Sequence, residues 1–115
     1  MLIWSSHHEL RIQFCAYKNP NPATCVQYPY LLDIQSDLLS ELRTTVVIPL
    51  TPSKLAAPIS LTRPNPTIAI DDNSFTIMTQ EIAGIDRNQL GAQMYNLSSY
   101  RSETITALDF VLSGI

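Results

Sequence analysis

Four prolines stand between Thr51 and Pro66, and their spacing limits the fold of this chain more than any other feature. They are Pro52, Pro58, Pro64 and Pro66. Each proline lacks a backbone N–H and has a fixed φ, so a long helix or a central strand is interrupted where one occurs. We therefore predict that residues 51–66 form a loop that crosses the fold and contains only short strand fragments.

The residues before this segment have the pattern of β-strands. Ile12, Phe14 and Ala16 alternate with residues 13, 15 and 17, which is the two-residue period of a strand. After a proline-containing loop over residues 18–24, we predict a second strand at 28–34, antiparallel to the first. A turn at 35–37 then leads to a central strand at 44–50 that is rich in β-branched residues. Pro49 is expected to mark a bulge or a sheet edge at its end.

The residues after the proline-rich segment predict a hairpin. Residues 67–70 form one strand, 71–73 the tight turn and 75–78 the returning strand. Residues 79–85 are expected to continue the sheet through a bend at Gly84. Residues 86–96 are left unassigned, because Gly91 would break a helix there.

The end of the chain predicts the main helix. Ser98 or Ser99 would cap it, and Ile105, Leu108 and Leu112 form an apolar stripe expected to face the sheet. Phe110 and Val111 widen the stripe, and Gly114 takes the position at which helices commonly end. The fold class predicted from the residues is mainly β: a strongly bent antiparallel sheet or partly open barrel with a C-terminal helix.

Size and charge narrow the class of protein. The 115 residues fit one domain, taken as 12–115, and residues 1–11 are interpreted as an extension that is either disordered or not native. Only 15% of the residues are charged, which favours a subunit interface, and the net charge of −3 argues against strong nucleic-acid binding. No apolar run is long enough to span a membrane and no signal peptide is recognised, so a cytoplasmic protein is expected.

The chemistry-bearing residues point to binding rather than catalysis. His7 and His8 are interpreted as a solvated pair, and Cys15 and Cys25 as free thiols, so neither a metal nor a cofactor is expected. No phosphate loop, GxGxxG, HExxH or GxSxG motif occurs. Asp71-Asp72 is more typical of a turn than of acid–base catalysis. A metal-free ribonuclease that uses an arginine (Arg43, Arg63 or Arg101) with a threonine or serine stays open.

Two apolar sites are candidates for a partner surface. Leu38 and Leu39 follow a polar turn and cannot both face inward on one strand, although a short buried strand start is the alternative. Ile115 directly follows Gly114, so this aliphatic side chain is either tucked into the core or kept free for a partner, and we favour the partner. For Leu112 the alternative is packing in the core.

Four sequence blocks in this order resemble the CcdB family of toxins from toxin–antitoxin pairs. They are LLDIQSDLL at 31–39, VVIPL at 46–50, MTQE at 78–81, and ALDF at 107–110 leading to Gly114-Ile115. The resemblance runs from about Ile12 to Ile115. It implies a homodimer with an SH3-like barrel and a C-terminal helix, the fold shared with MazF-type ribonucleases.

The resemblance also implies a mode of action. CcdB-like toxins are not enzymes: they bind the A subunit of DNA gyrase and trap its covalent complex with cleaved DNA, which blocks replication and transcription. A CcdA-like antitoxin wraps a disordered segment around the toxin, removes it from gyrase and co-represses the operon, so operator DNA is contacted only through the antitoxin.

Residue by residue, the resemblance implies a gyrase-facing patch of seven residues. They are Leu38, Leu39, Asp109, Leu112, Ser113, Gly114 and Ile115. Well-known members have tryptophan at the position of Ser113 and asparagine at that of Asp109. A tryptophan stacked on a partner arginine is worth about 0.5–2 kcal/mol, which serine cannot supply. We hypothesise that Asp109 compensates in part by a charged hydrogen bond to that arginine, worth about 1.5–3 kcal/mol.

Three other functions stay open at this stage. A MazF-like mRNA endoribonuclease would need a basic groove and an Arg/Thr pair on the same fold. A toxin that has lost activity and only binds antitoxin is kept open by Ser113. A structural or adaptor domain without toxicity is the third.

Overall fold

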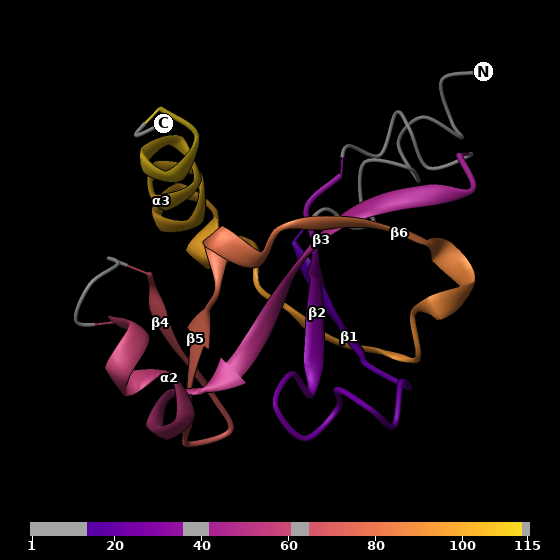
Figure 1. Cartoon of the computed structure of the whole chain (residues 1–115), viewed down its shortest axis with the longest axis horizontal. Helices are drawn as coiled ribbons and strands as arrows, with labels where there is room; N and C mark the ends of the chain where they lie inside the picture. Colours follow the sequence, from indigo (N-terminus) through magenta and orange to yellow (C-terminus); the bar gives the residue numbers. More distant parts are fainter. Residues whose placement is uncertain (1–13, 36–41, 61–64, 114–115) are drawn as a thin grey trace.

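A computed structural model of the chain describes residues 14–35, 42–60 and 65–113 (Figure 1). Within these ranges seven strands form one antiparallel, strongly curled sheet, and two helices lie on the side of the sheet that carries its fourth and fifth strands. The strands are β1 (Cys15–Lys18), β2 (Tyr30–Asp33), β3 (Thr44–Pro52), β4 (Thr67–Ile70), β5 (Asn73–Ile77), β6 (Ala83–Asp86) and β7 (Gln93–Asn96); the helices are α2 (Ser53–Ser60) and α3 (Arg101–Ser113). The mainly β class with a C-terminal helix is thereby confirmed.

The long strand β3 organises the sheet. β2 pairs along one side of it, from Tyr30 opposite Leu50 to Asp33 opposite Val47. On its other side the first half of β3 pairs with β6 and the second half with β5. The order β4-β5-β3-β2-β1-β7, with β6 added on β3, therefore curls into a half-barrel.

Pro49 lies where the neighbour of β3 changes from β6 to β5. Its carbonyl oxygen accepts a hydrogen bond from the Met78 N–H at 3.0 Å, and β3 continues beyond it to Pro52. The predicted irregularity is thus a change of partner inside the strand and not its end. A proline is tolerated there because the ladder is already interrupted at that point.

The core lies on the concave face of the sheet. Leu32, Ile48, Leu50 and Ile77 are completely buried, and they come from three adjacent strands. The aromatic rings of Tyr30, Phe75 and Tyr95 extend this core by edge-to-face contacts at 5.5 and 5.6 Å between ring centroids. The predicted strands at 28–34, 44–50, 67–70 and 75–78 supply this core.

The hairpin β4–β5 is confirmed with a two-residue turn. Asp71 and Asp72 have φ of 50° and 68°, the left-handed region that a type I′ hairpin turn requires at both positions. Aspartate tolerates this region better than most residues, because its short polar side chain bonds locally.

The interpretation of residues 51–66 as a loop is wrong for its first half, because Ser53–Ser60 is a helix. The first N–H groups of any helix have no intrahelical acceptor, so Pro52 costs nothing just before it. Pro58 removes only one hydrogen bond from a helix of eight residues, too little to prevent it.

Two smaller expectations are also corrected, and the unassigned segment 86–96 receives its structure. The strand after Met78 is broken by a 3₁₀ turn at Thr79–Glu81 and not at Gly84, which lies inside β6. Residues 87–89 form a second 3₁₀ turn before β7, the strand that pairs with β1. A third 3₁₀ turn, Ser98–Tyr100, leads into α3, and the Asn96 side chain rather than a serine accepts its first N–H, from Ser98 at 2.9 Å.

The alternation predicted around β1 also fails at its start. Phe14, Cys15 and Ala16 are all buried, because Phe14 has a φ of 65° and turns the chain before the strand begins. Within the described ranges, neither helix has the length and apolarity that crossing a membrane would take. Residues 1–11, with His7 and His8, lie outside the described residues.

Candidate functional site

Helix α3 buries a different face from the one that its apolar residues predict. Thr104 and Ala107 are the buried positions, whereas Ile105 is 41% exposed and Leu112 58% exposed. The helix packs beside the 3₁₀ turn Thr79–Glu81, where small side chains permit close approach. The expectation that Ile105 and Leu112 face the sheet is therefore wrong, although Leu108 is half-buried.

A third apolar side chain of α3 is also exposed. Phe110 is 57% exposed and lies five residues after Ile105, which places it about 140° away around a helix of 3.6 residues per turn. The helix therefore presents two apolar surfaces to solvent. We call the one that carries Ile105, Asp109 and Leu112 the outer face of α3.

The start of α3 is fixed by Phe14. The Phe14 N–H donates to the Asp33 carbonyl and its own carbonyl accepts from the Leu97 N–H, both at 2.7 Å. The Arg101 guanidinium lies over the Phe14 ring, 5.2 Å from its centroid. This contact joins the first residue of the helix to the strand core.

Two of the sequence-predicted site residues interact near the end of α3. The Ser113 hydroxyl donates to the backbone carbonyl of Asp109 at 2.6 Å. The Asp109 carboxylate is exposed, and no Lys or Arg within the described ranges pairs with it. Because Asp109 is four residues after Ile105 and three before Leu112, these three side chains share one helix face.

The other four predicted site residues cannot be placed. Leu38, Leu39, Gly114 and Ile115 lie outside the described residues. The structure therefore brings together Asp109, Leu112 and Ser113 on α3.

A polar cluster that sequence reasoning missed joins the end of β2 to the start of β3 and to the turn after β6. Asp33 is buried; its carboxylate accepts from the Thr45 hydroxyl at 2.8 Å and the Gln35 N–H at 3.0 Å, with Arg87 at 3.9 Å. Arg87 Nε also donates to the Leu42 carbonyl at 2.7 Å. A signal existed, because an acid within the apolar strand LLDI must be paired if it is buried.

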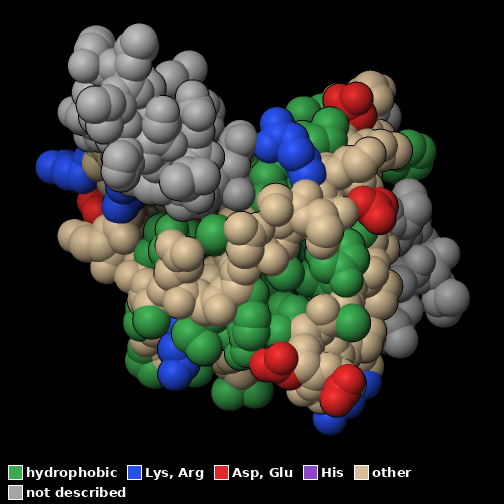
Figure 2. Space-filling view, turned by 180° about the vertical axis from the view of Figure 1, so that it is seen from behind, with side chains coloured by type: hydrophobic (Ala, Val, Ile, Leu, Met, Phe, Trp, Pro, Cys, Tyr) green, Lys and Arg blue, Asp and Glu red, His purple; other side chains and the backbone are tan. Residues whose placement is uncertain are grey.

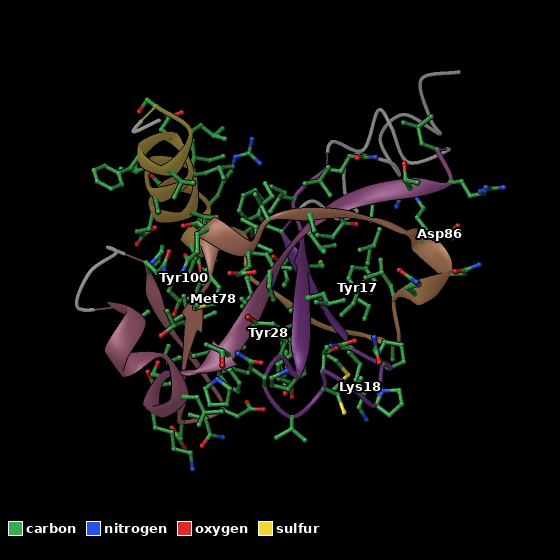
Figure 3. The ribbon with its side chains drawn as sticks, viewed as in Figure 1. Tyr17, Lys18, Tyr28, Met78, Asp86 and Tyr100 are labelled. Atoms are coloured by element: carbon green, nitrogen blue, oxygen red, sulfur yellow. The ribbon has the colours of Figure 1, made fainter. Side chains whose placement is uncertain are left out.

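A groove runs over the opposite side of the sheet from the core. Its volume is about 570 Å³ and its floor is apolar, formed by Leu31, Val47 and Pro49. The loop after β1 forms one wall, and β6 with the turn that follows it forms the other. In Figure 3 the labelled Tyr28 lies beside β2 and Asp86 lies where β6 enters that turn, which locates the groove between them.

One titratable pair of the described residues lies at the β4–β5 turn. Asp71 accepts from the Tyr95 hydroxyl at 3.1 Å. Hydrogen bonding to Tyr30 first, and then to Asp71, raises the pKa of Tyr95 to about 12. The described residues contain no cluster of three potential metal ligands, and Cys15 and Cys25 are not joined.

The surface around these sites is poor in charge. Figure 2 shows hydrophobic side chains across the middle of the back face, with Asp and Glu mainly at its margins. Such a surface suits contacts with other proteins better than contacts with a nucleic-acid backbone.

Comparison with known families decides the identity. Residues 13–114 match the family described as CcdB protein. The chain belongs to the CcdB family. The resemblance of the four sequence blocks is thereby confirmed, and this CcdB-family chain is a toxin of the toxin–antitoxin class. Its curled sheet with a C-terminal helix is consistent with the fold of that family.

Proposed function

We propose that this toxin binds the A subunit of DNA gyrase in the cytoplasm and traps the complex of gyrase with cleaved DNA. The observation that carries the proposal is the outer face of α3, where Ile105 and Leu112 are exposed beside the Asp109 carboxylate. Exposed apolar side chains grouped on one rigid element are typical of a protein–protein contact. The protein acts by binding and is not an enzyme.

The gyrase-binding patch that we propose has seven residues. They are Leu38, Leu39, Asp109, Leu112, Ser113, Gly114 and Ile115. The exposure of Leu112 and the shared face of Asp109 and Leu112 support their part in it.

Asp109 is proposed to form the main polar contact with gyrase. Its carboxylate is exposed on the face that carries Leu112, where it can accept hydrogen bonds from a partner arginine. Ser113 contributes little, because its short side chain bonds back to the Asp109 carbonyl.

The remaining partners follow from membership of the family. We propose that the toxin is a homodimer and that a CcdA-like antitoxin neutralises it and carries it to operator DNA. The exposed Phe110, which lies on another side of α3 from Ile105, provides further apolar area for such contacts.

The groove and the Asp33 cluster give the ribonuclease alternative less support than the outer face of α3 gives to gyrase binding. Among the described residues that line the groove there is no Lys or Arg. Thr45 and Arg87 do form an Arg/Thr pair, but Thr45 is 1% exposed and donates to Asp33, which also neutralises Arg87. A buried hydroxyl and a paired guanidinium are poor groups for RNA cleavage.

The test is a cleavage assay with purified gyrase, supercoiled plasmid and this protein. We expect linear DNA with covalently bound gyrase, and its loss when Gly114 and Ile115 are deleted. Leu112→Ser should lower the yield of linear DNA strongly. The matched control is Leu55→Ser, since Leu55 is 49% exposed on the other helix.

Asp109 is tested in the same assay by two variants. Asp109→Ala should weaken gyrase binding at least about tenfold, because a charged hydrogen bond is lost. Asp109→Asn introduces the residue common in the family. It removes the charge and keeps a side-chain oxygen that accepts hydrogen bonds, so it separates the two contributions. Unaltered affinity in Asp109→Ala would contradict the compensation hypothesis. Folded, dimeric protein that gives neither cleavage nor inhibition of supercoiling would favour an inactive antitoxin-binding relative or, with RNA cleavage, the ribonuclease.

A further inference from the structure

The groove over β2 and β3 is a second concave surface, separate from the outer face of α3. In Figure 1, α3 lies at the upper left, whereas the loop that walls the groove lies at the lower centre and β6 at the upper right. Its volume of about 570 Å³ falls within the range of sites that hold a small ligand or a few residues of a peptide. Its apolar floor rules out a highly charged ligand lying flat on it.

One wall of the groove is held in place before any partner binds. Asn19 is buried, and its side-chain NH₂ donates to the Thr24 hydroxyl at 3.0 Å and to the Tyr28 carbonyl at 2.8 Å. Its side-chain oxygen accepts from the Asn21 N–H at 3.1 Å. A single amide therefore fixes both ends of the loop, which lowers the entropy cost of binding against it.

The other wall is formed in part by β6, a strand at the border of the described sheet. Ala83 and Ile85 of β6 line the groove, and among the described strands β6 pairs only with β3. The second edge of β6 is thus without a strand partner in the described part of the chain. Such an edge can bind a peptide by adding it as a further strand.

The charge of the groove specifies the partner further. Among the described residues that line it, Glu81 alone has a charged side chain, and that side chain is exposed. No Lys or Arg in the described ranges forms an ion pair with it. Glu81 and Tyr28 both line the groove, and burial, and after it the negative charge of Glu81, raises the pKa of Tyr28.

We propose that the groove binds an extended peptide segment in which a Lys or Arg side chain pairs with Glu81 and an apolar side chain covers Leu31 and Pro49. The proposal rests on the antitoxin part of the proposed function, since the segment is taken to belong to that partner. The net charge of −3 also favours a basic partner. Glu81 is then a specificity-determining residue, because a neutral or acidic segment would leave it unpaired.

The experiment selects peptides from a displayed library of random 12-residue sequences on the immobilised full-length protein. We expect the enriched peptides to share a Lys or Arg at a fixed spacing from an aliphatic or aromatic residue. Glu81→Gln should weaken their binding at least about tenfold, and Glu81→Lys should select Asp or Glu at the same position. The matched control is Glu103→Gln, an exposed acid on α3, which should leave peptide binding unchanged.

Ala83→Trp tests the position of the peptide independently of charge. The indole fills the groove from β6 and should abolish binding of every enriched peptide, with urea unfolding used to verify that the variant is folded. Enriched peptides without a basic preference, or unaffected by Glu81→Gln, would overturn the charge selection. No binding peptides, or full binding by folded Ala83→Trp, would overturn the groove as the site.

The gyrase assay separates this proposal from the proposed function. Glu81→Gln and Glu81→Lys lie outside the proposed gyrase patch and should retain cleavage-complex formation. Wild-type protein that poisons gyrase but selects no peptide would overturn the groove alone. Protein that selects basic peptides but has no effect on gyrase would overturn only the gyrase part of the proposed function.

Discussion

The inner face of the sheet and the outer face of α3 are both apolar, yet they have opposite environments. Leu32, Ile48 and Leu50 are 0% exposed, whereas Ile105 and Leu112 are 41% and 58% exposed. The first surface stabilises the fold by burial, at roughly 25 cal/mol per Å² of apolar area. The second contributes little to folding and, under the proposed function, is the surface that contacts gyrase. Hydrophobicity alone therefore does not distinguish a buried scaffold residue from an exposed one in this protein.

The strongest test of this comparison is Leu50→Ala. The side chain is completely buried between neighbouring strands, so its truncation leaves a cavity and should lower the free energy of unfolding by about 2–5 kcal/mol. The measurement is urea unfolding followed by circular dichroism. A loss below about 1 kcal/mol would mean that the inner face is packed loosely and that the contrast with α3 is overstated.

A second test concerns how tightly the sheet edge is packed. Gly91 donates its N–H to the Lys18 carbonyl at 2.8 Å, and an added Cβ would lie 2.7 Å from that oxygen. Gly91→Ala should therefore force the backbone apart and cost about 1–3 kcal/mol. Gly84→Ala is the matched control, because its Cβ would lie 3.9 Å from the Thr45 carbonyl oxygen, an ordinary contact. Equal losses in thermal unfolding would contradict the close-approach argument.

Arg101 marks the boundary between the two regions. Arg101→Ala removes the guanidinium over the Phe14 ring and should lower stability by about 0.5–1 kcal/mol. Hydrogen exchange should show faster opening of α3 while β3 stays protected. If β3 and α3 lose protection equally, the helix is part of the same cooperative unit and the comparison has to be redrawn.

Leu112, on the outer face of α3, should tolerate substitution better than Leu50, Gly91 and Arg101. Leu112→Ser creates no cavity, because the side chain is exposed. It is expected to change the free energy of unfolding by no more than about 0.5 kcal/mol. The same variant is the one expected to lose gyrase poisoning. A loss of stability comparable to that of Leu50→Ala would show that Leu112 is packed in the protein and would favour the alternative of core packing.

The smallest effect is confined to high pH. The folded-state pKa of Tyr95 is raised to about 12 from 10.0, so the folded protein favours the protonated phenol. Its contribution to stability is fully present below pH 10 and is lost as the pH rises from 10 towards 12. Tyrosinate absorbance at 295 nm should show Tyr95 ionising last, and Asp71→Asn should move its pKa towards 10.

Local patterns predicted the elements better than they predicted the contacts. The hairpin with strands predicted at 67–70 and 75–78 follows from turn chemistry, and the central strand predicted at 44–50 follows from its β-branched residues; both signals act between neighbours in sequence. The helix α2 was missed, because a single interior proline was given more weight than the tolerance of the first helical turn. Asp109 and Leu112 of the predicted patch lie on one exposed face, and their role in gyrase binding stays a prediction. Asp33, Thr45 and Arg87 were not connected before the fold was known.

By itself the sequence determined that the chain is a mainly β domain with one long C-terminal helix, and that it carries the blocks of the CcdB family. Only the tertiary structure decided that α3 buries Thr104 and Ala107 and leaves Ile105 and Leu112 exposed. The reason is that burial depends on what lies opposite a side chain. The surface opposite α3 is formed by Phe14 and the 3₁₀ turn Thr79–Glu81, which are far away in sequence. The periodicity of the helix residues cannot predict where these residues lie.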